Sequence, residues 1–160
     1  MTIIKKKIIL IYILIFCVLI LGSAYFIEYI LNHQPCNLCL IERIPYLLTI
    51  VLISLIFILK KFQKLILFFI LLLFVFGTIV SFYHVGIEQG FFSETFACNL
   101  GNSEKILSSS EILEELKNKT VSCKDITITF FGLSLATFNT IISLFLSFIV
   151  GYILKNYDKN

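Results

Sequence analysis

Four long apolar stretches dominate the chain, at about residues 8–27, 42–59, 65–84 and 131–154. A helix that rises about 1.5 Å per residue needs about 20 apolar residues to cross the hydrocarbon core of a bilayer. Each stretch must be helical, because lipid offers no hydrogen-bond partner to an open backbone amide. The pattern therefore predicts an all-α membrane protein, a single domain over residues 1–160 that folds as a four-transmembrane-helix bundle.

Two external loops, at about 28–41 and 85–130, connect these spans. In the second loop, residues 108–117 have the amphipathic pattern of a short helix, and Ser108 and Glu111 have capping-box spacing. This short external helix either packs on the loop itself or lies in the membrane interface.

Composition and charge agree with a membrane protein. Only 14% of the residues are charged and 59% are hydrophobic, whereas a soluble domain has roughly 25% charged residues. Most lysines precede the first span, join the second span to the third or follow the fourth, which marks the cytoplasmic side. These residues are Lys5, Lys6, Lys7, Lys60, Lys61, Lys64, Lys155 and Lys159. Both termini are therefore predicted to be cytoplasmic and the cysteine-bearing loops external. The net charge of +3 follows from this pattern, and we infer no nucleic-acid partner from it.

The N-terminal segment has a second interpretation. Its lysines, its apolar run and Gly22-Ser23-Ala24 resemble a cleavable signal peptide. A retained span is favoured, because apolar residues resume just after these small residues and cleavage would leave three helices to pack. The cysteines face the same side in either case.

The five cysteines are the candidate chemistry. Cys36 and Cys39 form a C-x-x-C pair, and a bridge across two residues constrains the unfolded chain too little to be a strong staple. We predict no metal site, since zinc needs four ligands and Cys98 with Cys123 supply no second C-x-x-C. The pair is therefore interpreted as a site of thiol–disulfide exchange. Cys17, inside the first span, is predicted to be an apolar packing residue.

The position of the C-x-x-C pair favours reactivity. Pro35 places the pair at the start of the second helix, where free amides and the macrodipole favour the thiolate over the thiol. Cys39 and Arg43 are at positions i and i+4, so the guanidinium can lie over the sulfur. Pro45 removes the hydrogen bond back to Ile41, so the first turn need not continue as regular helix.

Arg43 and His84 are the candidate cofactor-binding residues. Each has a simpler interpretation as an interfacial group, an arginine that snorkels to the headgroups and a histidine that hydrogen-bonds there. The functional interpretation is that Arg43 binds an anionic or polar group in the membrane, such as a quinone carbonyl. His84 would then donate a hydrogen bond or a proton to the same reduced cofactor. Glu28 and Glu42 are expected only to mark the interface.

Cys98 and Cys123 lie in the second external loop. A bridge between them can act as a structural disulfide that stabilises the loop. It can also act as a redox station, because accessible loop disulfides are the ones most easily attacked by an incoming thiolate. Both interpretations remain open from these residues alone.

Together these features resemble a known family. CNLCLIERIPY at 36–46, FYHVGIE at 82–88, the loop cysteine pair and FGLSLA at 131–136 are similar to the DsbB family of bacterial inner-membrane enzymes. The resemblance covers nearly the whole chain and implies a multi-pass bundle that binds a quinone, ubiquinone or menaquinone, near the outer leaflet. The implied partner is a DsbA-like periplasmic thioredoxin-fold protein, a strong oxidant that only a more oxidising acceptor can recharge. We expect a working monomer.

The resemblance also implies a role for each cysteine outside the first span. Cys98 would form the mixed disulfide with the reduced partner, and Cys123 would be released to attack the bridge between Cys36 and Cys39. Cys39 would then face the quinone as a thiolate. The quinone-site residues of the family correspond to Arg43 and His84.

Two alternatives remain. In a quinone oxidoreductase of the vitamin K epoxide reductase type, the loop cysteines precede the C-x-x-C, whereas here they follow it, which argues against that type. A non-enzymatic small membrane protein with two structural disulfides would have bridges that resist mild thiols and would use no redox cofactor.

Overall fold

The four apolar stretches form four long helices. The structure is a computed structural model that describes residues 3–59, 62–93, 98, 123–124, 129–130 and 132–157. The helices are α1 (Ile3–Tyr29), α2 (Asn37–Ile58), α3 (Gln63–Glu88) and α5 (Leu135–Lys155). All four are long and apolar enough to cross a membrane, which confirms the predicted all-α four-span bundle.

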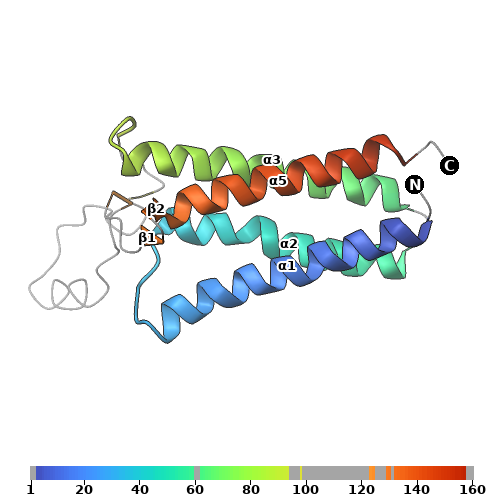
Figure 1. The fold of residues 1–160 in the computed structure, drawn as a ribbon, viewed down its shortest axis with the longest axis horizontal. Coiled ribbons are helices and arrows are strands. Elements are labelled where there is room, and N and C mark those ends of the chain that lie inside the picture. Colours follow the sequence, from blue (N-terminus) through green and yellow to red (C-terminus); the bar gives the residue numbers. More distant parts are fainter. Residues whose placement is uncertain are drawn as a thin grey trace, which may run out of the picture.

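The helices run lengthwise beside one another (Figure 1). Helix α3 packs against both α2 and α5, and α1 packs against α2. Helix α1 begins and α5 ends at the same end of the bundle, while the short strands β1 (Thr129–Phe130) and β2 (Leu133–Ser134) lie at the opposite end. We call this opposite end the outer end, after the side on which the sequence analysis places the cysteines.

The helices extend beyond the predicted membrane spans at the outer end. Helix α2 begins at Asn37, just after Pro35 as predicted and ahead of the span predicted from about 42, and α3 continues to Glu88, past the span predicted to end at about 84. The fourth helix begins at Leu135 rather than at 131, because the residues before it form the β1–β2 hairpin. Gly132 at the turn has a φ of +79°, a left-handed conformation that favours glycine. The short external helix predicted at 108–117 lies outside the described residues.

The core of the bundle consists of aliphatic and aromatic side chains along its length. Ile53, Ile70 and Phe74 are completely buried, and so is Cys17, which is a free cysteine. The prediction that Cys17 is a packing residue is thereby confirmed. Large apolar side chains on the outward faces, such as Phe145 with 63% of its surface exposed, suit contact with lipid.

Gly77 of α3 brings α2 and α3 together. A Cβ atom at this position would lie 3.3 Å from the Cγ of Pro45, and the ring of Tyr46 meets that of Phe74 edge-on. Small residues at such contacts let membrane helices approach closely, and this packing holds them together where lipid is as apolar as the helices. Helix α2 continues past Pro45 to Ile58, so the irregularity expected after its first turn is not found.

The Gly77→Leu variant is expected to push α2 and α3 apart and to destabilise the bundle by about 1–3 kcal/mol, as overpacking commonly does. Unfolding by dodecyl sulfate, followed through the helical circular dichroism signal, measures the change. Gly22→Leu is the matched control, because nothing lies within 4 Å of a Cβ built at that position. Equal stability of the two variants would contradict the close contact at Gly77.

Candidate active site

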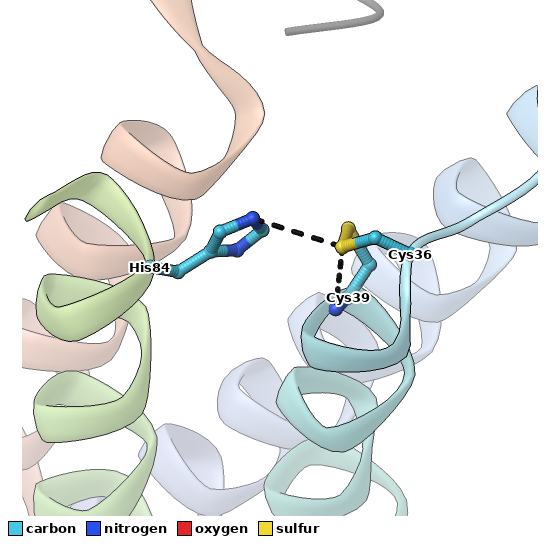
Figure 2. Close-up of side chains that lie close together, drawn as sticks. All are labelled: Cys36, Cys39 and His84. Atoms are coloured by element: carbon cyan, nitrogen blue, oxygen red, sulfur yellow. Dashed lines mark hydrogen bonds between the residues drawn. A yellow bond between two sulfur atoms is a disulfide. The ribbon is translucent and has the colours of Figure 1, made fainter. Parts of the chain in front are cut away.

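The C-x-x-C pair forms the start of α2. Cys36 is the N-cap residue, with extended backbone (φ −71°, ψ 166°), and its Sγ accepts a hydrogen bond from the backbone N–H of Cys39 at 3.2 Å. The two cysteines form a disulfide with their Cα atoms 5.1 Å apart (Figure 2). Cys36 is buried and Cys39 is half-buried. The predicted position at a helix N-terminus, where the dipole favours a thiolate, is confirmed.

The second disulfide packs against the first turn of α2. Cys98 and Cys123 are joined with their Cα atoms 5.9 Å apart. They share one cluster of buried side chains with Cys36, Leu38 and Ile87. The sequence analysis expected an accessible loop disulfide, but both loop cysteines are at least 95% buried, because they pack on the outer end of the bundle. The two disulfides therefore belong to one site.

His84 points from α3 toward the C-x-x-C pair, as Figure 2 shows. Its Nε2 lies 3.7 Å from the Sγ of Cys36, and the side chain is buried. The structure thus places a histidine, predicted from the sequence only as a polar group at membrane depth, beside the C-x-x-C disulfide.

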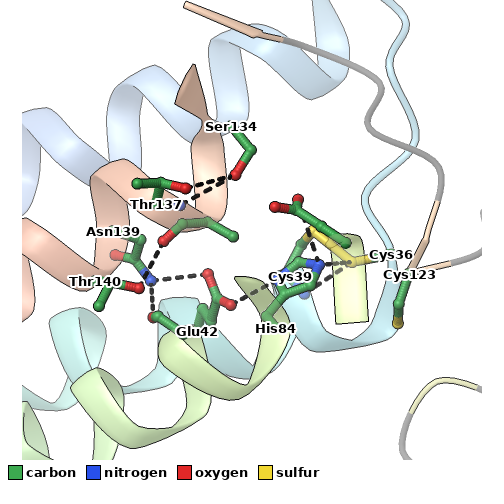
Figure 3. Close-up of polar contacts among 12 residues, drawn as sticks. Cys36, Cys39, Glu42, His84, Cys123, Ser134, Thr137, Asn139 and Thr140 are labelled. Carbon is green, nitrogen blue, oxygen red and sulfur yellow. Dashed lines mark hydrogen bonds and ion pairs between the residues drawn. A yellow bond between two sulfur atoms is a disulfide. The ribbon is translucent and has the colours of Figure 1, made fainter. Parts of the chain in front are cut away.

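The other ring nitrogen of His84 is paired with a buried carboxylate. Nδ1 lies 2.7 Å from Oε1 of Glu42, whose other oxygen accepts a hydrogen bond from Nδ2 of Asn139 at 2.8 Å (Figure 3). The disulfide sulfur of Cys36 can only accept a hydrogen bond, whereas in the reduced pair a neutral ring with Nδ1–H donated to Glu42 can offer the lone pair of Nε2 to the Cys36 thiol. Glu42 was expected only to mark the membrane interface, and it lies instead inside the bundle with 7% of its surface exposed.

Asn139 extends this network across three helices. Its amide nitrogen donates to Ser81 Oγ at 2.7 Å as well as to Glu42, and its Oδ1 accepts from the Tyr46 hydroxyl. Tyr46 also contacts Ser143 Oγ at 2.9 Å. Because each member has a partner, the network holds Glu42, and through it His84, in a defined place.

Arg43 lies on the side of α2 that contacts α1. Its guanidinium forms an ion pair with Glu28 at 2.5 Å and lies over the ring of Tyr25, 5.1 Å from the centroid. No hydrogen bond or ion pair joins Arg43 to Cys39 or to His84 within the described residues. The predicted placement of the guanidinium over the Cys39 sulfur therefore stays a prediction.

Sequence reasoning missed the residues that support His84. Asn139 is a carboxamide in an otherwise apolar span, and a polar side chain at membrane depth is commonly functional. Ser143 is one turn further on the same helix, and Ser81 is one turn before His84. The spacings of these polar residues could have been noticed in the sequence. Only the packed helices show that Asn139 bonds Glu42 and Ser81, and that Ser143 bonds Tyr46 in the same network.

Comparison with known proteins agrees with this geometry. The family model described as disulfide bond formation protein DsbB matches residues 6–153. The chain belongs to the DsbB family. A protein of Rickettsia prowazekii (strain Madrid E), named uncharacterized protein RP370, is 30% identical to this chain over 139 residues. Those residues make up 86% of this chain and 81% of that protein.

Membership of the DsbB family assigns the chain to the machinery that forms disulfide bonds, as a thiol oxidoreductase. The four apolar helices make it a multi-pass membrane protein of that family. The buried pair of disulfides beside His84 is the part of this DsbB-family bundle where thiol chemistry can occur.

Proposed function

We propose that the protein is a quinone-dependent thiol oxidase that reoxidises a DsbA-like thioredoxin-fold donor in the periplasm. The observation that carries the proposal is the packing of both disulfides in one buried cluster, next to His84, at one end of a four-span bundle. The lysine distribution supports a location in the bacterial inner membrane with both termini cytoplasmic and the cysteine loops periplasmic. We further propose that it works as a monomer.

Electrons enter at the loop disulfide. A donor thiolate attacks Cys98, the bond from Cys98 to Cys123 breaks, and Cys123 leaves as a thiolate. Cys123 then attacks Cys36, so that the bond to Cys39 breaks and Cys39 leaves as a thiolate. The second donor thiolate next attacks the donor sulfur that is bonded to Cys98, which forms the donor disulfide and releases Cys98 as a thiolate. Cys98 then attacks Cys123, the bond from Cys123 to Cys36 breaks, Cys36 leaves as a thiolate, and the loop disulfide is restored. Two electrons have then moved from the donor dithiol to the Cys36–Cys39 pair.

The burial and surroundings of the four cysteines support this order. Cys36 shares a cluster with Cys98 and Cys123, so the exchange between the bridges needs only a small movement. Asn37, which follows Cys36, donates a hydrogen bond to the carbonyl of Cys98 at 3.1 Å and ties the loop to α2. Cys39 is less buried than Cys36, as suits the sulfur that delivers electrons to the membrane.

His84 handles the proton of the Cys36 thiol. Its Nε2 lies 3.7 Å from this sulfur in the disulfide form, and in the reduced pair a neutral Nε2 can take the thiol proton before reoxidation. Glu42, at 2.7 Å from Nδ1, stabilises the positive charge that the ring then carries. His84 is thus proposed to keep Cys36 available as a thiolate.

The side of α2 that bears Cys39 and Arg43 fits a quinone, either ubiquinone or menaquinone. Leu40 and Ile44 beside them are 45% and 49% exposed, so this side of the helix faces the lipid from which a quinone would enter. Glu28 orients the guanidinium of Arg43, a planar donor suited to a carbonyl oxygen. A bound quinone would accept the two electrons of the reduced cysteine pair.

The overall activity is tested with the purified full-length protein in lipid, a reduced thioredoxin-fold donor and a quinone. Quinone absorbance is expected to fall as donor thiols disappear, two thiols for each quinone. Absence of quinone reduction with every such donor would overturn the proposed function.

The order of exchange is tested by Cys123→Ala. In this variant Cys98 has no bridge partner and is a free thiol, so the variant is mixed with the oxidised donor. The Cys98 thiolate is expected to attack the donor disulfide, whose bond breaks to release one donor thiolate, and alkylation of that thiolate retains the mixed disulfide at Cys98. Non-reducing electrophoresis and peptide mapping identify the linked cysteine. Cys17→Ala is the matched control, since Cys17 is a free cysteine in the bundle core. Attachment of the donor to Cys36 would contradict the assigned roles.

A further inference from the structure

A second chemical property of the site appears when the C-x-x-C pair is considered in its reduced form. The sulfurs of Cys36 and Cys39 and a ring nitrogen of His84 all lie within 4.8 Å of one another. Two cysteine sulfurs and an imidazole are the donor types that zinc and related thiophilic cations prefer. The side chains come from two helices of the bundle and are buried or half-buried, so this arrangement is built into the fold.

Glu88 carries a carboxylate next to these three residues, close to the ring of His84. It follows His84 by one turn of α3, and its Oε1 lies 3.9 Å from Nε2, with 9% of the side chain exposed. In a tetrahedral zinc site, bond lengths of about 2.0–2.3 Å place neighbouring ligand atoms about 3.3–3.8 Å apart. The separation of 3.7 Å from Nε2 to the Cys36 sulfur already falls in this range. We call the four residues the thiol–imidazole cluster: Cys36, Cys39, His84 and Glu88.

The groups behind His84 are those of a metal-binding histidine. A histidine that binds a metal usually donates its other N–H to a carboxylate, which fixes the ring and makes the coordinating nitrogen more basic. Glu42 occupies this position at 2.7 Å from Nδ1, and Asn139 in turn holds Glu42. In the reduced protein, a neutral ring with Nδ1–H donated to Glu42 therefore directs the lone pair of Nε2 toward the side on which the sulfurs lie.

We propose that the reduced protein binds a thiophilic divalent cation, zinc or cadmium, at the thiol–imidazole cluster. Binding forms bonds from the metal to both sulfurs and releases the two thiol protons, with no transfer of electrons. The disulfide form has no thiolates to offer, so binding requires reduction by a chemical reductant or by a donor. A bound metal occupies both sulfurs and blocks their reoxidation, and this inhibition, unlike the binding, rests on the proposed function.

The sequence analysis predicted no metal site because it considered the four external cysteines as the ligands. The structure supplies further donors from α3, where His84 faces the C-x-x-C pair and Glu88 lies beside the same ring nitrogen of His84. A site with two sulfurs from one helix and two further donors from another needs no second C-x-x-C.

Binding is tested on full-length protein that carries Cys98→Ser and Cys123→Ser, so that the loop thiols do not contribute. The protein is reduced under argon, freed of reductant and titrated with cobalt(II), then with zinc. We expect one equivalent of cobalt to give thiolate charge-transfer absorption and the intense d–d bands of a tetrahedral site, and zinc to abolish both. The oxidised protein is expected to show neither. Equal binding by oxidised and reduced protein would overturn the proposal.

Variants identify the ligands. His84→Gln and Glu88→Gln are each expected to weaken cobalt binding, and Glu42→Gln to weaken it by about 10- to 100-fold, as loss of a carboxylate behind a metal-bound histidine does. Glu28→Gln is the matched control, because Glu28 pairs with Arg43 instead. X-ray absorption is measured on the zinc-loaded protein in which all four residues of the thiol–imidazole cluster are intact and only Cys98 and Cys123 are replaced by serine. The zinc is expected to have two sulfur ligands, with nitrogen or oxygen as the others. A zinc shell without sulfur, or unchanged cobalt affinity in His84→Gln, would overturn the proposal.

Inhibition is tested separately in the wild type. Zinc at a concentration that saturates the reduced cluster is expected to stop turnover of donor thiols, and a chelator to restore it. If the reduced protein fails to bind metal but oxidises a donor, the metal inference fails alone. If it binds metal but oxidises no donor, the proposed function fails and the metal site stands.

Discussion

Replacing Cys39 by serine is expected to reduce donor-driven quinone reduction to the background rate. Without the sulfur of Cys39 there is no Cys36–Cys39 bridge to accept electrons, and a lone Cys36 thiol cannot pass on a pair. The loop disulfide remains, so one equivalent of donor is still oxidised when variant and donor are mixed. Quinone absorbance and donor thiol counts, measured in the same sample, report the two quantities.

A thiol that lies outside the site provides the control for this variant. Cys17→Ser removes the buried free cysteine of the bundle core and is expected to keep the wild-type rate. An unchanged rate in Cys39→Ser would refute the proposed path of electrons. The single equivalent of oxidised donor is equally informative, because a protein with two purely structural disulfides would oxidise none and its bridges would survive mild thiols.

An enzyme of the vitamin K epoxide reductase type is distinguished from this proposal by the order of its cysteines along the chain. Both would lose activity with Cys39, since both use a C-x-x-C pair. They differ in where the loop cysteines lie along the chain, and here both loop cysteines follow the pair. The match of residues 6–153 to the DsbB model agrees with that order.

The sequence predicted the membrane spans well because a backbone in lipid must satisfy its own hydrogen bonds, so each long apolar run forms a helix. It also placed the C-x-x-C pair at a helix start, since proline is common at the start of a helix and Pro35 lies just before the N-cap residue Cys36. Boundaries at the outer end were less accurate. There the chain leaves the hydrocarbon, so apolar character no longer marks where the helix ends, and Glu88 still belongs to α3.

The contacts between side chains in the site could not be predicted from the sequence, and the reason is geometric. Which face of α3 meets α2 depends on their relative rotation, and that rotation follows from the close contact between Gly77 and Pro45. The sequence could name His84 and Glu42 as polar groups at similar depth without showing that they meet. The burial of the loop disulfide was hidden likewise, because it depends on the packing of Cys98 and Cys123 against Leu38 and Ile87, which are distant from them in the sequence.

The Glu42→Gln variant is expected to slow turnover by about 100-fold near neutral pH, the lower part of the range for a positioned proton acceptor. The amide of glutamine can accept the Nδ1–H of His84 only with its oxygen, and its nitrogen then faces the amide of Asn139, which is also a donor. If the amide turns the other way, His84 must carry its proton on Nε2 and can no longer take the proton of Cys36. Either arrangement removes the negative charge that stabilises the protonated ring.

The pH dependence distinguishes loss of this proton acceptor from simple loosening of the bundle. As the pH rises, hydroxide forms the Cys36 thiolate without help from His84, so the deficit of Glu42→Gln is expected to shrink, whereas a packing defect would persist at every pH. Glu28→Gln removes a carboxylate that pairs with Arg43 and is expected to leave the shape of the pH profile unchanged. A Glu42→Gln deficit that is constant across the pH range would show that Glu42 acts only through stability, and His84 would then need another partner for the proton.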